Sequence, residues 1–427
     1  MFFGYINGSR SEKIRCNCKL IIKPTIYQID LIIVIDSIFL LIYTYIINII
    51  TIGGMDMSIK SYTLKLTAVL ITVIMLFCSC AAAEKPSARV TVDGTKLVVN
   101  GNELWLSGMN APWHNWNDFD GHMDVDFWER EFKRFKEDKI NCVRIWVNCT
   151  GESIVDLGGD GSVKSVNEAH WTDLEKLFDL ARENEVYVMA TLLSFDHFKG
   201  GGGSGARWQS LVKNREFCDQ YAEMYVKEFC NRFGDNEYVF SIDIMNEPDW
   251  VYENEECGKV PWENLSYFFG KCAATIHENS DILVTVGTGI IKYNSEKYEG
   301  DKVSDEYLQS LCENENAYLD FYSTHYYNWQ MTWFSTPVGK TPEEFGLEGG
   351  KPCVIGETHN DDEAEISLSL SDKYKDLYNN GWSGILVWSQ TDGTEDVWYG
   401  YSNTSKATKA MYEYVREKIY PNETADE

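Results

Sequence analysis

Two glutamates stand where buried strands are expected to end. Glu247 follows a largely apolar, β-branched and aromatic run, residues 239–246, and precedes Pro248. Because proline has no N–H to donate to a sheet, this order predicts that the strand stops there. A second short apolar run, residues 352–356, also leads into a glutamate, Glu357. Retaining hydrolysis of a glycosidic bond requires a pair of carboxyl groups, which two glutamates at strand ends could supply.

The rest of the chain supplies elements that could hold these glutamates side by side. From residue 88 onward the residues alternate, with Asp93-Gly94 and Asn100-Gly101 at two tight turns, which predicts two successive β-hairpins. Short apolar strands then alternate with helical patterns as far as residue 419. This pattern indicates an α/β fold, a (β/α)8 TIM barrel preceded by a short N-terminal β-hairpin segment.

The expected elements follow from the spacing of apolar residues. The predicted barrel strands are 104–110, 141–147, 186–193, 239–246, 282–287, 319–327, 352–357 and 384–388. The predicted helices are 127–136, 171–184, 214–233, 262–278, 305–313, 363–379 and 407–419. Two glycine-rich stretches, 156–162 and 200–205, are interpreted as surface loops.

Several other side chains fall at the same ends of the predicted strands as the glutamates. They are Asn110, Arg144, Asn246, His325, Tyr327 and Trp388. A single residue at a strand end is more often a loop anchor than a catalytic group. In a barrel, however, all carboxyl-terminal strand ends meet at one rim, where active sites are built. Their convergence therefore predicts a site on this rim.

Composition excludes some classes of partner. The formal net charge is −28, so we expect no nucleic-acid partner and no anionic membrane surface, whereas a neutral polymer is compatible. Aromatic residues make up 14% of the chain, which suits both a core and stacking on sugar rings. The cysteines lack the spacing of a zinc site, so we expect no metal and no cofactor. The spacing of the cysteines does not determine which of them would form disulfides. We expect the protein to be a monomer.

The N-terminal region precedes the expected fold. Residues 55–83 have basic residues, an apolar core and a Cys-Ser-Cys80-Ala ending, which is typical of an export signal. The ending resembles a bacterial lipoprotein signal with Cys80 as the lipidated residue, and the alternative is an ordinary signal peptide cut near residues 81–83. Residues 1–54 are interpreted as a misassigned gene start or a membrane span. The catalytic domain is expected over residues 84–427.

Three motifs carry a resemblance to a known family. Taken in order, Asn246-Glu247-Pro248, His325-Tyr326-Tyr327 and Ile355-Gly356-Glu357 resemble glycoside hydrolase family 5, within the clan whose catalytic glutamates lie on strands four and seven. The resemblance covers residues 88–420. It implies a two-step retaining mechanism with Glu247 as the acid/base and Glu357 as the nucleophile.

The resemblance also implies roles for the surrounding residues. Arg144 and Tyr327 would contact Glu357, and His325 would position Glu247. Asn246 would bind the sugar 2-hydroxyl, and Trp388 would form the floor under the sugar. Further sugar contacts are expected from Asn110 on the same rim and from Trp113 and Trp250, which lie just beyond strand ends.

The backbone sugar is indicated by two further residues. Leu193 stands where many cellulose-cleaving family members carry a histidine, and His197 is interpreted as a loop residue. Arg144-Ile-Trp146 resembles the Arg-x-Trp of family mannanases. Both favour a β-1,4-linked mannan or glucomannan, as in bacterial endo-β-1,4-mannanases. The alternatives are an endo-β-1,4-glucanase and, from another class, a non-catalytic surface glycan-binding barrel.

We expect an exported protein, either a cell-surface lipoprotein or a secreted one, with membrane contact only through the N-terminal anchor or signal.

Overall fold

The computed structural model describes residues 86–423, except 152, 201–202, 348–349, 362–366 and 390–400. The predicted export signal, its Cys80 and the preceding residues 1–54 therefore lie outside the described residues. Within the described part, no helix combines the length and the apolar character needed to cross a membrane.

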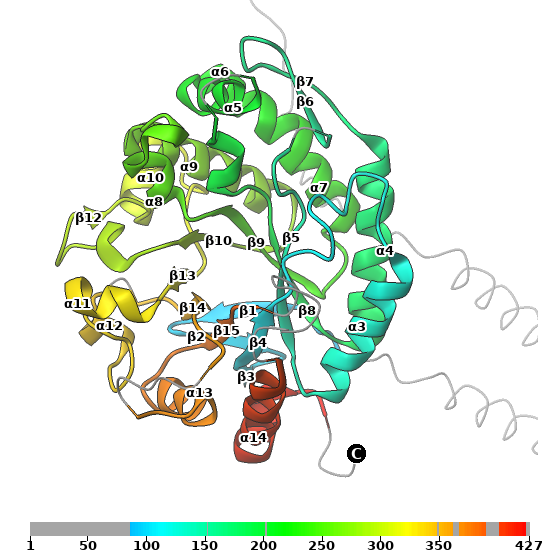
Figure 1. Cartoon of the computed structure of the whole chain (residues 1–427), viewed down its shortest axis with the longest axis vertical. Helices are drawn as coiled ribbons and strands as arrows, with labels where there is room; N and C mark the ends of the chain where they lie inside the picture. Colours follow the sequence, from blue (N-terminus) through cyan, green and yellow to red (C-terminus); the bar gives the residue numbers. More distant parts are fainter. Residues whose placement is uncertain are drawn as a thin grey trace, which may run out of the picture. The chain divides into compact units, whose positions relative to one another are not determined.

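Eight parallel strands close into a barrel, which confirms the predicted fold (Figure 1). In barrel order the strands are β4 (Leu106–Asn110), β5 (Cys142–Trp146), β8 (Tyr187–Thr191), β9 (Val239–Asn246), β10 (Leu283–Thr288), β13 (Tyr322–His325), β14 (Cys353–Glu357) and β15 (Gly384–Val387). Every residue of these strands is buried. Their apolar runs are long enough to be covered on both faces, as parallel strands require.

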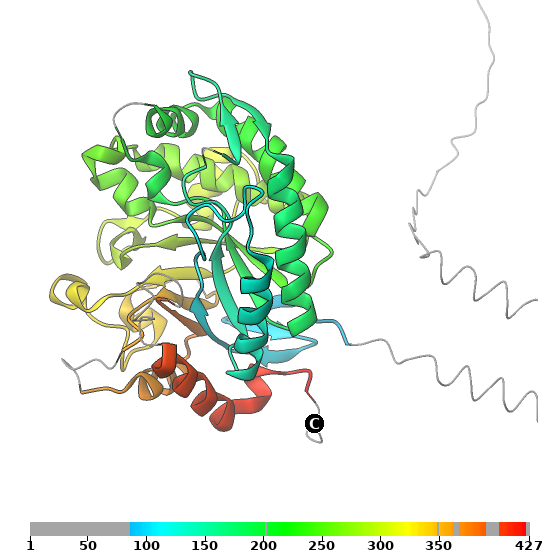
Figure 2. The ribbon, with the colours of Figure 1, turned by 45° about the vertical axis from the view of Figure 1, so that its right-hand side comes forward.

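Helices surround the strands, as the ribbon in Figure 2 shows. The longer ones are α3 (Val125–Glu137), α4 (Glu168–Asn184), α5 (Ser204–Lys213), α9 (Trp262–Asn279), α10 (Asp305–Cys312), α13 (Leu370–Asn379) and α14 (Tyr401–Ile419). Between α4 and α9 lie α6 (Arg215–Tyr221) and α7 (Lys227–Phe233), which are joined by a π-helical turn at Ala222–Val226. Helix α3 shows why such a sequence forms a helix. Asp124 caps its first turn, and Phe127, Phe132 and Phe135 form its buried face.

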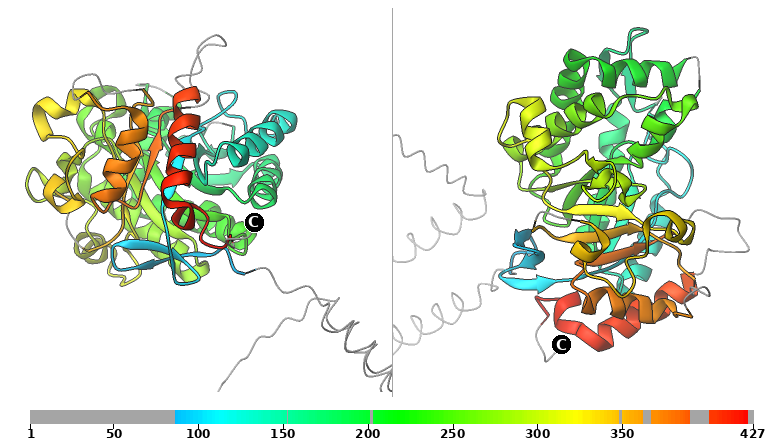
Figure 3. Two further views of the ribbon diagram at one scale, coloured as in Figure 1. Left: turned by 90° about the horizontal axis from the view of Figure 1, so that it is seen from below. Right: turned by 90° about the vertical axis from the view of Figure 1, so that its left-hand side faces the viewer.

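The two predicted hairpins form a three-stranded antiparallel sheet of β1 (Val90–Asp93), β2 (Lys96–Val99) and β3 (Asn102–Leu104). Its apolar side chains pack with the first residues of the barrel strands, including Leu106, Cys142 and Leu283. Figure 3 shows this sheet, in blue, at one end of the molecule. The sheet therefore covers the amino-terminal end of the barrel and leaves the opposite end free for a site.

Some predicted boundaries and loops differ from the structure. Helix α13 begins at Leu370 rather than at 363, because Ser369 caps it by accepting a hydrogen bond from the Asp372 N–H. Helix α14 begins at Tyr401, six residues before its predicted start. The loop predicted at 156–162 lies within a hairpin of β6 (Val155–Leu157) and β7 (Val163–Val166). Short, partly exposed strands lack the apolar runs on which the prediction depended.

The cysteines of the described residues form no disulfides with one another. Seven of the eight are buried, and the other, Cys312, is half-buried. The core that contains most of them is rich in aromatic and branched aliphatic side chains. Burial of apolar side chains is therefore the main stabilising contribution in this part of the chain.

Asn141, which directly precedes β5, connects three elements of the fold. Its Oδ1 accepts a hydrogen bond from the Ser107 N–H at 2.8 Å, and its Nδ2 donates to the carbonyls of Trp105 and Ile419, each at 2.9 Å. The side chain is 1% exposed. One amide thus joins the first strand, the second strand and the last helix.

We predict that Asn141→Ala lowers the free energy of unfolding by about 3 kcal/mol, because it leaves buried backbone groups without partners. Chemical denaturation of the purified protein measures this change. The control is Asn184→Ala, whose side chain makes one hydrogen bond, to the Leu180 carbonyl of its own helix. Equal losses in the two variants would contradict a special role for Asn141.

Candidate active site

The two glutamates lie at the carboxyl ends of strands four and seven of the barrel. Glu357 is the last residue of β14, and Glu247 follows β9 directly. One side-chain donor atom from each of Glu247, His325 and Glu357 lies within 4.8 Å of the others. Carboxylates this close match the short separation of retaining glycosidases, since inverting enzymes hold theirs about 6.5–9.5 Å apart.

The backbone at Glu247 turns sharply out of its strand. Its φ of 48° and ψ of 57° place it in the left-handed region, and its N–H donates to the Gly287 carbonyl at 2.6 Å. The carboxyl oxygens have separate partners. Oε1 lies 3.0 Å from His325 Nδ1, and Oε2 accepts a hydrogen bond from Trp250 Nε1 at 2.9 Å. Burial raises the pKa of Glu247 to about 7, against the opposing charge of Arg144.

Glu357 has a different set of partners. Its Oε1 accepts a hydrogen bond from Arg144 Nη1 at 2.6 Å, and its Oε2 accepts one from the Tyr327 hydroxyl at 3.0 Å. Burial raises the pKa of Glu357 above its ordinary value, whereas His325, Arg144 and the Tyr327 hydrogen bond lower it. The two hydrogen bonds favour the ionised carboxylate, so Glu357 is the better nucleophile of the pair.

Arg144 is completely buried, and a residue that the sequence analysis missed supports it. Asp243, inside β9, accepts hydrogen bonds from Arg144 Nε at 2.9 Å and Nη2 at 2.7 Å. The Asp243 carboxylate also accepts from the Gly287 N–H at 2.7 Å and from the Thr191 hydroxyl at 3.1 Å. The available signal was an aspartate in the middle of an otherwise apolar strand, where an unpaired charge is costly.

Two predicted sugar-binding amides contact Arg144. Asn110 Oδ1 accepts from Nη1 at 2.9 Å, and Asn246 Oδ1 accepts from Nη2 at 2.8 Å. Asn110 Nδ2 also donates to the carbonyls of Gly356 and Leu386, and its side chain is 0% exposed. Asn110 therefore holds Arg144 in place from inside the barrel, which differs from the expected contact with a sugar. The Asn246 bond orients its amide so that the NH2 group points away from Arg144.

A cluster of tryptophans lies beside the glutamates. The ring of Trp113 lies 5.2 Å from that of Trp146 and 6.0 Å from that of Trp388. Trp116 packs edge-on against Trp113, with ring centroids 4.8 Å apart, and is 45% exposed. A bridge between His359 and Trp388 places Trp388 beside the end of β14. The cluster thus provides an aromatic surface next to Glu357.

The end of strand three lacks a histidine in the site. Leu193 is fully buried, and His197 is 1% exposed in a short helical turn, where its Nδ1 lies 3.1 Å from the Ser194 N–H nitrogen. Its Nε2 lies 3.1 Å from Asn148 Oδ1, and burial lowers the pKa of His197 to about 3. His197 is therefore a neutral side chain that contacts the protein.

The group of Glu247, His325 and Glu357 also has donor atoms that could ligate a divalent cation. Arg144 already supplies a positive charge 2.6 Å from one Glu357 oxygen. A cation at the same carboxylate would be repelled by this guanidinium. The donor set is therefore a poor fit for a metal ion.

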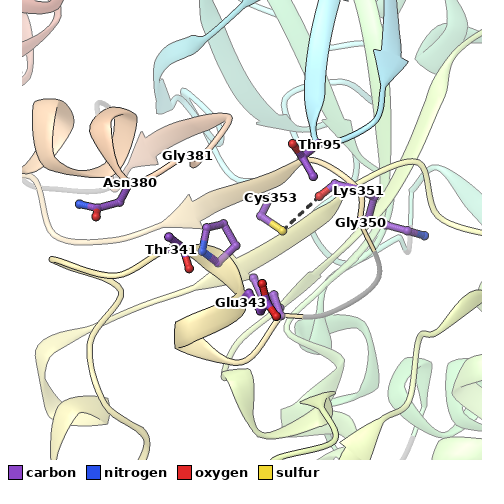
Figure 4. A pocket seen from close by; sticks show the side chains of 10 residues that line it. Thr95, Thr341, Glu343, Gly350, Lys351, Cys353, Asn380 and Gly381 are labelled. Carbon is purple, nitrogen blue, oxygen red and sulfur yellow. Dashed lines mark hydrogen bonds between the residues drawn. The ribbon is translucent and has the colours of Figure 1, made fainter.

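A separate cavity of about 540 Å³ lies away from the glutamates (Figure 4). Its lining includes Thr95 from the turn between β1 and β2 and Cys353 from the first position of β14. Lys351, at its edge, binds both Asp305 carboxylate oxygens and the Leu319 carbonyl. This position is at the amino-terminal ends of the strands, whereas barrel active sites occupy the opposite end.

Comparison with known proteins gives consistent matches. Residues 98–420 match the family described as Cellulase (glycosyl hydrolase family 5). A mannan endo-1,4-beta-mannosidase from Mytilus edulis is 25% identical over 337 residues, which cover 71% of this chain and 89% of that protein.

Solved structures with the same barrel include the beta-mannanase of the blue mussel Mytilus edulis, with a TM-score of 0.65 and 22% identity over 76% of this chain and 96% of that one. The beta-1,4-mannanase of the sea hare Aplysia kurodai matches with a TM-score of 0.67 and 22% identity, over 78% of this chain and 99% of that one. These relatives are animal proteins, which differs from the expected bacterial character.

We predict that Asp243→Asn lowers the free energy of unfolding by about 3–5 kcal/mol, because it removes one partner of a buried charge pair. Guanidinium-induced unfolding measures the loss. Asp156→Asn provides the control, since Asp156 is exposed in β6. If the two variants unfold at the same denaturant concentration, Asp243 does not stabilise Arg144 as argued.

Proposed function

The chain belongs to glycosyl hydrolase family 5, and from this membership we propose that it is a retaining, endo-acting hydrolase of β-1,4-linked mannan or glucomannan. The observation that carries the proposal is the pair of glutamates at the ends of strands four and seven, with a carboxyl oxygen of Glu247 within 4.8 Å of one of Glu357. The relatives named mannan endo-1,4-beta-mannosidase support the choice of substrate. Leu193 and Trp146 support it independently.

In the first step, a Glu357 carboxylate oxygen attacks the anomeric carbon and forms a glycosyl ester. Glu247 gives its proton to the glycosidic oxygen as the bond between that oxygen and the anomeric carbon breaks. In the second step, Glu247 accepts a proton from water, and the water oxygen attacks the same carbon and releases Glu357. Arg144 and Tyr327 hold Glu357 in place through their hydrogen bonds.

The substrate contacts remain part of the proposal. The Asn246 NH2 group would donate to the sugar 2-hydroxyl, a contact that strengthens in the transition state. Trp388 would lie under the sugar at the cleavage site, and Trp113 would extend the aromatic surface to a neighbouring sugar. His325 would hold Glu247 through the 3.0 Å contact with Oε1.

The second candidate is an endo-β-1,4-glucanase, which the family description, Cellulase, favours. A non-catalytic glycan-binding barrel is the candidate from another class. A binding protein has no need for one protonated and one ionised glutamate side by side. The different partners of Glu247 and Glu357 therefore favour an enzyme.

Export belongs to the same proposal. An extracellular polysaccharide cannot reach an enzyme inside the cell, and residues 55–83 have the pattern of an export signal. Mass spectrometry of the mature N-terminus would distinguish a lipidated Cys80 from a cut near residues 81–83.

We predict that Glu247→Ala and Glu357→Ala each lower turnover on the preferred polysaccharide by about 10³-fold or more, since each removes one of two essential groups. Reducing-sugar release from glucomannan, galactomannan and carboxymethylcellulose measures activity and identifies the backbone sugar. Separation of the products by size distinguishes endo from exo action.

Glu183→Ala, on the exposed face of α4, is the control and should retain full activity. Near-normal turnover by either active-site variant would overturn the assignment of roles. Binding of all three polysaccharides without product release would favour the glycan-binding alternative.

We predict a bell-shaped pH dependence of kcat/KM. Glu247 must be protonated, and its pKa is raised to about 7, so activity falls as the pH rises through about 7. Glu357 must be ionised, and its pKa lies above its ordinary value, so activity falls as the pH decreases through that higher value. Initial rates on a soluble mannan across this pH range test both limbs. A flat profile above pH 7 would contradict the role of Glu247 as the acid.

A further inference from the structure

The short helix α8 (Pro248–Glu253) begins immediately after Glu247 and is firmly anchored. Pro248 occupies its first turn, where a missing N–H costs nothing. The second residue, Asp249, is 2% exposed, and its Oδ2 accepts a hydrogen bond from the Gly289 N–H at 2.6 Å. This hydrogen bond joins α8 to the loop that follows β10.

This anchored helix places an indole beside the acid/base carboxyl. Trp250 lies three residues after Glu247, and its backbone N–H donates to the Glu247 carbonyl at 3.2 Å. Its indole Nε1 donates to Glu247 Oε2 at 2.9 Å. An indole N–H is a donor only, so Oε2 must act as the acceptor whether or not Glu247 carries its proton.

We propose that Trp250 is a positioning residue that fixes the orientation and proton affinity of the Glu247 carboxyl, rather than mainly a platform for a sugar. This inference rests on the proposed role of Glu247 as the acid/base. The sequence analysis assigned Trp250 to sugar stacking because it follows a strand end. The hydrogen bond gives it a role in the chemical step as well.

Other contacts limit how the carboxyl can turn. Oε1 lies 3.0 Å from His325 Nδ1. On another side, a Cβ built on Gly289 would lie 3.2 Å from Glu247 Cγ, so the Gly289 backbone packs closely against the side chain. With Trp250 holding Oε2, the terminal torsion of Glu247 is restrained at both oxygens. A general acid gains from such restraint, because its proton must be directed at the glycosidic oxygen.

The same hydrogen bond also affects the pKa of Glu247. A donor to a carboxylate stabilises the ionised form more than the neutral form, so Trp250 opposes the effect of burial on Glu247. Several other charged or titratable groups face Glu247 from the surrounding elements. They are Arg144 on β5, Asp196 and Lys199 around the turn after β8, Asp249 on α8, His325 on β13, Tyr327 after β13 and Glu357 on β14. None of them changes in a variant that alters only the indole.

The test is Trp250→Phe, which keeps an aromatic ring and removes the N–H. We expect the basic limb of the kcat/KM profile to move to higher pH by about one unit, because loss of the donor raises the pKa of Glu247. We expect kcat on mannan to fall by about tenfold. The loss should be much smaller on an aryl glycoside with a nitrophenol leaving group, which departs without protonation. If Trp250 only stacked on a sugar, Trp250→Phe would leave the basic limb of the kcat/KM profile unchanged. The loss of activity would then not depend on the leaving group.

The matched control is Trp262→Phe on α9, whose indole N–H has no partner among the described residues. It should leave the pH profile unchanged. If Trp250→Phe keeps the wild-type basic limb and changes only KM, the inference fails and sugar stacking is the remaining role. Absence of β-glycan hydrolysis by the wild-type protein would instead reject the proposed function.

A measurement on the wild-type protein covers the case in which Trp250→Phe does not fold. The indole N–H resonance of Trp250, assigned by nitrogen-15 labelling, should titrate near pH 7 with Glu247. This titration should disappear in Glu247→Gln. A resonance that does not respond to pH in the wild-type protein would also overturn the inference.

Discussion

The buried guanidinium of Arg144 is the interaction on which the site depends. Arginine has five N–H donors, and here all five are used, on Asp243, Asn246, Asn110 and Glu357. These partners come from three other strands, β9, β4 and β14, so Arg144 on β5 connects four of the eight barrel strands. A charge with no exposure is tolerated only with such complete pairing, and the pairing in turn fixes where each partner lies.

The surroundings of the two glutamates differ in a way that supports their proposed roles. Arg144 with Asp243 and Glu357 carries one net negative charge when both carboxylates are ionised. A carboxyl oxygen of Glu247 lies within 4.8 Å of one of Glu357, and the Glu247 side chain is 15% exposed. Desolvation of the Glu247 carboxyl raises its pKa to about 7 even though Arg144 and the Trp250 hydrogen bond lower it, so the proton stays on Glu247 up to about neutral pH. The proposed nucleophile and the proposed acid thus differ through their surroundings, although their chemical groups are identical.

The Arg144 network and the tryptophans proposed to contact the sugar lie on different parts of the barrel. The charged network lies on or directly after the barrel strands, where backbone pairing holds the strands in register. The tryptophan cluster and Trp250 lie just beyond those ends, on loops and on a short helix. Relatives that share 22–25% identity with this chain keep the barrel. Loops can therefore vary around a site whose strands keep their places in the barrel.

The sequence by itself determined the strand ends and the residues placed on them. Apolar runs and Pro248 are local signals, so the barrel, Glu247, Glu357 and the rim position of Arg144 could be predicted from spacing. The tertiary structure alone decided which side chains meet. Arg144 pairs with Asp243 across 99 residues and with Glu357 across 213, separations at which no local pattern carries information. The contact of Asn110 with Arg144 is likewise a result of barrel closure, because hydrogen bonds depend on positions in space. The Trp250 bond to Glu247 spans only three residues, but it depends on the left-handed backbone of Glu247 and on the helix that begins after it.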